Sequence, residues 1–163
     1  MNKNARAGFS MIELSIYMGI LAILILVLTD IAASILNVTL SYQSTSSVSR
    51  DGRYIYSRLI YDINRAESAS QPASLGDTTQ AMQLTISGKN YDYAISGDNL
   101  TLTEETGSYI LNSPDTRISN LEFTRIGNTS GKHTFRINFD VISKINVNNR
   151  FETAEFQTTA GLR

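Results

Sequence analysis

A run of 20 positions, 9–28, constrains this chain more than any other feature of its sequence. The run is apolar apart from four residues: Ser10, Glu13, Ser15 and Gly19. As an α-helix rising about 1.5 Å per residue it would span about 30 Å, the thickness of a bilayer core. No other segment of the 163 residues is as long and as apolar. The sequence therefore predicts one membrane-spanning helix, close to the N-terminus.

The flanks of this helix predict its orientation. Lys3 and Arg6 lie on the short N-terminal flank. The positive-inside rule keeps that end in the cytoplasm, so the chain after Asp30 is expected outside the cytoplasmic (inner) membrane.

Glu13 does not fit a plain membrane anchor. It lies one turn into the apolar run, and an ionised carboxylate at the bilayer centre costs about 2.5–3.5 kcal/mol. No basic residue lies between Gly8 and Arg50 to pair with it in the same chain. A free amino group on Phe9, exposed by cleavage after Gly8, would be a partner, and in a filament it could belong to a neighbouring subunit.

The stretch Gly8-Phe9-Ser10-Met11-Ile12-Glu13 resembles the type IV prepilin signature, a basic leader ending in glycine followed by Phe-Ser/Thr-Leu-Ile-Glu. The resemblance implies that a membrane prepilin peptidase cleaves after Gly8 and that the new N-terminal Phe9 is N-methylated. It also implies that Glu13 neutralises the amino terminus of an adjacent subunit. Met11 replaces the commoner leucine. The resemblance covers about the first thirty residues.

Two plainer interpretations of the N-terminus remain open. A conventional secretory signal peptide would be cut after the apolar core, near Ala33. A simple signal anchor would keep the whole segment and carry Glu13 by accident. Each predicts a different mature N-terminus.

Beyond the membrane the helix is expected to continue as an amphipathic segment over 30–67. Its apolar residues recur mostly at spacings of three, four and seven; they are Ile31, Ile35, Val38, Tyr42, Val48, Ile55, Leu59 and Ile63. Asp62 lies four residues after Arg58 and three before Arg65, which predicts ion pairs on the exposed face. The serine-rich positions 44–49 and Gly52 are poor helix formers and predict a weak or bent stretch.

The remainder, 68–163, predicts an antiparallel β head. Positions 68–79 are rich in Ser, Gln, Pro, Gly and Asp and predict a loop. Alternating or short apolar segments then follow at close spacing, as in a sheet of hairpins; they are 82–86, 91–95, 100–102, 109–111, 121–123, 135–141 and 151–159. The expected fold class is α+β, a long N-terminal helix packed against an antiparallel sheet. The leader, 1–8, and the spanning helix, 9–29, precede these parts.

Two local patterns resemble a narrower group, the minor pilins and the J-type minor pseudopilins of type II secretion. Residues 58–66, Arg-Leu-Ile-Tyr-Asp-Ile-Asn-Arg-Ala, resemble the Arg-Leu-x-x-Asp-Ile-x-x-Ala stretch at the end of their helix. Residues 158–163, Thr-Thr-Ala-Gly-Leu-Arg, resemble their last strand. Two features depart from major pilins: Asp30 stands where many have a helix-kinking proline, and the chain has no cysteine.

Motifs for catalysis or metal binding are missing from the sequence. His133 is the single histidine, and there is no cysteine to share a metal with it. Acids gather around predicted turns without the Asp-x-Asp-x-Asp-Gly spacing of a calcium loop; they are Asp92, Asp98, Glu104, Glu105 and Asp115. No phosphate-binding glycine loop and no Gly-x-Ser-x-Gly elbow occurs. We therefore expect no enzyme, cofactor, metal or small-molecule substrate.

Charge argues against nucleic acid as a partner. The formal net charge is −1, and loss of the leader with Lys3 and Arg6 makes it −1 − 2 = −3. Basic residues of the last third alternate with acidic ones, as on a solvated face.

The sequence thus predicts a structural subunit of a type IV pilus-like filament. It would be inserted in the membrane, processed by prepilin peptidase, and assembled with other pilins or pseudopilins through its N-terminal helix, as a minor or tip subunit. The filament would be extracellular or periplasmic, and serve a pilus, type II secretion or competence. The alternative is a monomeric, membrane-tethered module whose head binds a glycan, peptide or DNA. Crosslinking through the apolar helix separates the two.

Overall fold

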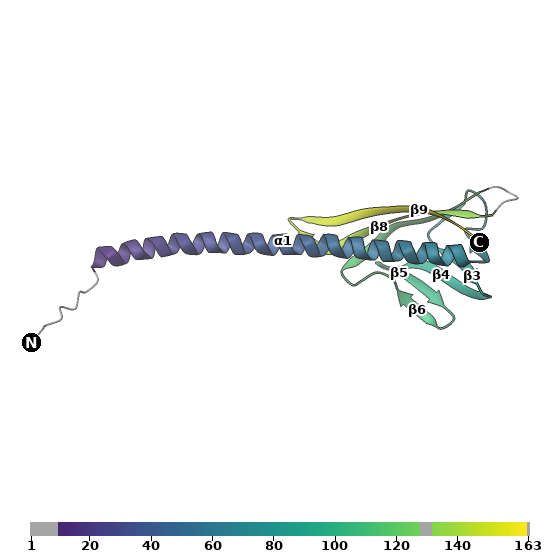
Figure 1. Ribbon diagram of the computed structural model, residues 1–163, viewed down its shortest axis with the longest axis horizontal. Coiled ribbons are helices and arrows are strands. Elements are labelled where there is room, and N and C mark those ends of the chain that lie inside the picture. Colours follow the sequence, from purple (N-terminus) through teal and green to yellow (C-terminus); the bar gives the residue numbers. More distant parts are fainter. Residues whose placement is uncertain (1–9, 128–131, 163) are drawn as a thin grey trace, which may run out of the picture. The chain divides into compact units, whose positions relative to one another are not determined.

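The computed structural model describes residues 10–127 and 132–162, which form one helix and nine strands (Figure 1). The helix, α1, runs without interruption from Met11 to Arg65, so the serine-rich stretch and Gly52 do not break it. The chain divides into two compact units, 1–39 and 40–163. Of the described residues, the first unit contains Ser10 and the N-terminal part of α1. The second contains the rest of α1 and all the strands.

The strands form two antiparallel sheets. The first sheet has the order β1-β3-β4-β5-β6 and the second the order β2-β7-β8-β9. The strands are β1 (Ser68–Gln71), β2 (Thr78–Thr79), β3 (Met82–Ile86), β4 (Lys89–Ser96), β5 (Asn99–Glu104), β6 (Gly107–Ile110), β7 (Thr116–Ile126), β8 (Thr134–Val147) and β9 (Arg150–Gly161). In Figure 1, β8 and β9 run along one side of α1, while β3 to β6 lie on the other side.

The expected α+β class and antiparallel pairing are confirmed, with two differences in detail. The strands are divided between two sheets, where the sequence predicted one. The predicted loop 68–79 contains two short strands, because Ser68–Gln71 pairs with β3 and Thr78–Thr79 pairs with β7. Polar composition concealed both, since only Ala69 of β1 is buried.

The core of the second unit lies between one face of α1 and the two sheets. Four residues of the predicted helical stripe are buried there, namely Val48, Ile55, Leu59 and Ile63. They pack with apolar side chains of both sheets, the largest of which are Tyr93, Phe123, Phe135 and Phe139. The first four members of the predicted stripe are exposed instead; they are Ile31, Ile35, Val38 and Tyr42.

Gly52 allows α1 to approach β9 closely. A Cβ atom built on Gly52 would lie 2.0 Å from Cζ of the Phe156 ring, far inside van der Waals contact. That ring stacks on Phe139, with centroids 5.3 Å apart and planes inclined by 11°. A weak helix former therefore occupies this position because the second sheet needs the space.

Asp62 joins the end of α1 to the first sheet. Its carboxylate is fully buried and pairs with Arg58 Nε at 2.6 Å and Arg65 Nη2 at 2.9 Å. The Tyr93 hydroxyl of β4 donates a third bond, and Arg58 also reaches Glu104 at 3.2 Å. The two predicted ion pairs form, but around a buried acid; their assignment to the exposed face was wrong. Burial, then the bond to Asp62 and its negative charge, raise the pKa of Tyr93.

Asp51 joins the middle of α1 to the start of β7. Its carboxylate accepts bonds from the Ser113 backbone N–H at 2.8 Å, Ser113 Oγ at 2.6 Å and Thr116 Oγ1 at 2.7 Å. Burial by itself would raise the pKa of Asp51. The three bonds, with help from Arg50, outweigh burial and hold the pKa below its ordinary value of 3.8.

This lowered pKa predicts acid sensitivity. A carboxyl whose pKa is lower in the folded than in the unfolded state stabilises the fold at pH values above its unfolded pKa. That stabilisation is lost as the pH falls from about 5 through the folded pKa. We expect the free energy of unfolding of the full-length protein in detergent to fall over this range, and to fall less in Asp51→Asn. Urea titrations at several pH values measure both, with Asp115→Asn, which removes an exposed carboxylate, as the control. Equal pH dependence of the wild type and Asp51→Asn would contradict the prediction.

Candidate assembly helix

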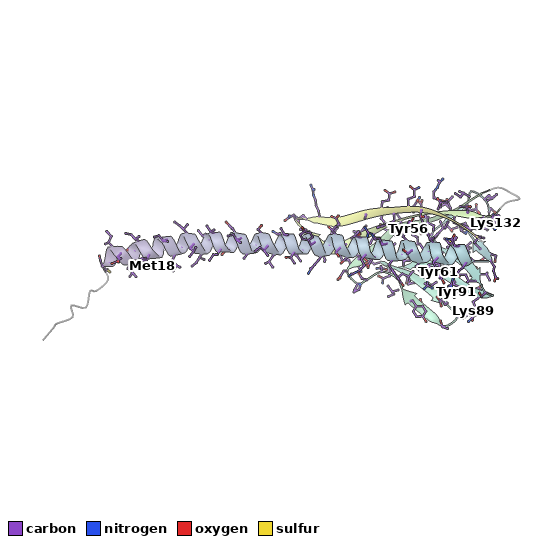
Figure 2. The ribbon with its side chains drawn as sticks, in the orientation of Figure 1. Met18, Tyr56, Tyr61, Lys89, Tyr91 and Lys132 are labelled. Atoms are coloured by element: carbon purple, nitrogen blue, oxygen red, sulfur yellow. The ribbon has the colours of Figure 1, made fainter. Side chains whose placement is uncertain are left out.

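The N-terminal part of α1 exposes nearly all of its apolar surface. The large apolar side chains from Met11 to Leu28 are between 49% and 85% exposed. Figure 2 shows Met18 and its neighbours projecting outward from the helix. By length and composition this helix can cross a membrane, and none of its most apolar part is buried within the protein. Such a surface needs lipid or other apolar helices around it.

Two hydroxyl groups beside the apolar side chains of this part of α1 donate hydrogen bonds within the helix. Ser15 Oγ donates to the Met11 carbonyl at 3.0 Å, and Thr29 Oγ1 donates to the Ile25 carbonyl at 2.8 Å. Bonds of this kind let Ser and Thr enter an apolar medium without an unpaired polar group.

Glu13 is exposed in the first turn of α1, where the helix dipole favours a negative charge. Among the ion pairs and side-chain hydrogen bonds described within residues 10–127 and 132–162, none involves its carboxylate. The other predicted site residues, Lys3, Arg6, Gly8 and Phe9, lie outside the described residues. Cleavage after Gly8, methylation of Phe9 and the pairing of Glu13 therefore stay predictions.

The outer face of α1 carries a second feature, which the sequence did not single out. Two arginines, a tyrosine and hydroxyl residues line an open groove of about 560 Å³; they are Tyr42, Thr45, Ser46, Ser49, Arg50 and Arg53. Tyr42 is 74% exposed, although the sequence placed it on the buried stripe. The sequence feature that could have revealed this groove is the spacing of Arg50 and Arg53, which are three residues apart and so share a face of the helix.

Nothing in the described parts of the head forms a metal centre. Within residues 10–127 and 132–162, no three His, Cys, Asp or Glu side chains gather closely enough to hold an ion. His133 is half-buried and immediately precedes β8.

Within the part of the chain that the structure describes, these observations define an α+β protein with one helix that is long and apolar enough to cross a membrane. The family model of the prokaryotic N-terminal methylation motif matches residues 3–29. The N-terminal part of the chain therefore carries the prepilin-type methylation motif, which supports a type IV pilin-like protein. No curated protein and no solved structure matches the chain.

Proposed function

We propose that this protein is a structural subunit of a type IV pilus-like filament, processed by prepilin peptidase after Gly8 and N-methylated on Phe9. The observation that carries the proposal is the exposed apolar helix of the methylation motif, with Glu13 in its first turn. The helix resides in the inner membrane with its N-terminus cytoplasmic and its head outside. On assembly it packs laterally against the helices of other subunits.

Glu13 supplies the specific contact in this proposal. Its carboxylate pairs with the amino group of Phe9 on a neighbouring subunit. The attraction between these charges is screened far less in an apolar surrounding than in water.

The minor or tip position in the filament rests on the resemblance of residues 58–66 and 158–163 to minor pilins and J-type pseudopilins. Counting the copies of this chain per filament tests that position.

Processing is tested by the mature N-terminus. Intact-mass and N-terminal analysis of protein from the native membrane should find a chain that begins at N-methylated Phe9. A chain beginning near Ser34 would establish a conventional signal peptide, and an unprocessed chain would establish a simple signal anchor.

Replacement of Glu13 should affect assembly and leave membrane insertion intact. Glu13→Gln keeps the size and hydrogen-bonding capacity but removes the charge, so we expect filament incorporation to fall about tenfold or more, as for the loss of about 1.4 kcal/mol. Removing a charge from an apolar helix does not disfavour membrane residence. The measurement compares the amount of protein in sheared filaments with that in the membrane fraction. Wild-type incorporation of the Gln variant would contradict the charge-pairing account.

A further inference from the structure

Asp30 and the arginines of the outer groove lie on different parts of α1, and each needs a partner of opposite charge. Asp30 is exposed just beyond the apolar run, and no lysine or arginine occurs between Ser10 and Ser49. Lateral packing of apolar helices would take water away from this carboxylate, and a dehydrated charge needs an opposite charge close by.

The arginines of the outer groove are the available cations on α1. Arg58 and Arg65 are already paired with Asp62. Arg53 is exposed, and no ion pair of its guanidinium is described within residues 10–127 and 132–162. Arg50 makes one long contact, 3.7 Å from Nε to Asp51 Oδ1, and its side chain is 65% exposed.

The spacing of these residues matches between the two parts of the helix. Tyr42 and Arg53 are eleven residues apart, and so are Gly19 and Asp30. At 3.6 residues per turn, two side chains that are eleven residues apart point in directions about 20° apart around the helix axis, so they share a face. Tyr42 is a large exposed side chain, whereas Gly19 has open space where a Cβ would be. If two parallel copies of α1 are shifted along the axis by one suitable distance, Tyr42 of one copy therefore faces Gly19 of the other. At the same shift Arg53 faces Asp30.

We propose that, in the filament, a second copy of this chain binds along the groove with its helix displaced by 23 residues, about 35 Å along the axis. Asp30 of one copy pairs with Arg53 of the other, with Arg50 on the same face. Tyr42 packs over Gly19 at the same offset. The inference rests on the proposed filament function and requires at least two adjacent copies, so it excludes a single copy at the tip.

The contact differs from the one assigned to Glu13. Phe9 and Glu13 are four residues apart, which corresponds to an offset of about 6 Å. A subunit therefore makes the two contacts with different neighbours.

Introduced cysteines test the proposal directly, because the natural chain has none. In cells that assemble the filament, oxidation of the Asp30→Cys/Arg53→Cys double variant should give a ladder of disulfide-linked multimers. Each single variant, and the matched pair Asp30→Cys/Arg136→Cys with an exposed arginine of β8, should give none of this ladder. Filaments that contain the double variant but form no ladder would overturn the inference and leave the filament function standing. If wild-type protein itself never enters filaments, both proposals fail.

Neutral substitutions provide a second measurement that needs no oxidation. Asp30→Asn and Arg53→Gln should each lower filament incorporation about tenfold, as for about 1.4 kcal/mol. The combined Asp30→Asn/Arg53→Gln variant should be no worse than either single variant, because each single substitution already removes the same contact. Multiplicative losses in the double variant, or no loss in the singles, would overturn the pairing.

Discussion

Replacement of Asp62 by alanine should lower the free energy of unfolding of the head by about 3 kcal/mol. Breaking a buried ion pair by removing one partner costs about 3–5 kcal/mol. The lower end applies because the side chains of Arg58 and Arg65 are 30% and 35% exposed, so water can reach both guanidinium groups after the change. The Tyr93 hydroxyl, which is buried, loses its acceptor entirely. Urea unfolding of the full-length protein in detergent, followed by the near-ultraviolet circular dichroism of tyrosine, measures the loss.

A surface ion pair provides the matched control for Asp62. Lys89 and Glu105 lie 3.5 Å apart with side chains 56% and 59% exposed, and such pairs contribute about 0–1 kcal/mol. Glu105→Gln should therefore change the stability by less than about 1 kcal/mol. Asp62→Asn adds a spectroscopic signature, since removing the negative charge should lower the pKa of Tyr93, followed by phenolate absorption. Equal losses of stability in Asp62→Ala and Glu105→Gln would contradict the buried-pair interpretation.

Gly52→Ala should destabilise the head by about 1–3 kcal/mol, the range for overpacking a core. In an exposed helix the same change stabilises by about 0.5–1 kcal/mol, so the sign of the result is informative. Here the added methyl would lie 2.0 Å from the ring of Phe156, which cannot move freely because it stacks on Phe139. The clash should outweigh the gain in helix propensity. The measurement is again urea unfolding in detergent.

Rescue and control variants isolate the clash at Gly52. Phe156→Leu removes the ring, so Gly52→Ala should cost less in that background than in the wild type. Gly19→Ala is the matched control, because nothing lies within 4 Å of its added Cβ and it should leave the unfolding of the head unchanged. Equal losses at Gly52 with and without the Phe156 ring would mean that the clash is not the cause.

The sequence predicted the features that depend on local pattern. The apolar length of 9–28 was enough to predict a helix that can cross a membrane, whereas the contact assigned to Glu13 stays a prediction. Period-two segments predicted the strands from β3 onward, since alternation follows directly from the geometry of a half-buried strand. The motif itself is short and local, so the methylation signature was identifiable from residues 3–29 alone.

Burial, close approach and long-range pairing depended on the tertiary structure. Arg58, Asp62 and Arg65 had the spacing of a surface network, but the first sheet covers Asp62 and turns the network into a buried one. Gly52 was a weak helix former by sequence, and its reason is the ring of Phe156, more than 100 residues later in the chain. Local sequence determines which residues can form helix or strand; only the packed chain determines which side chains lose contact with water, and therefore which charges need partners.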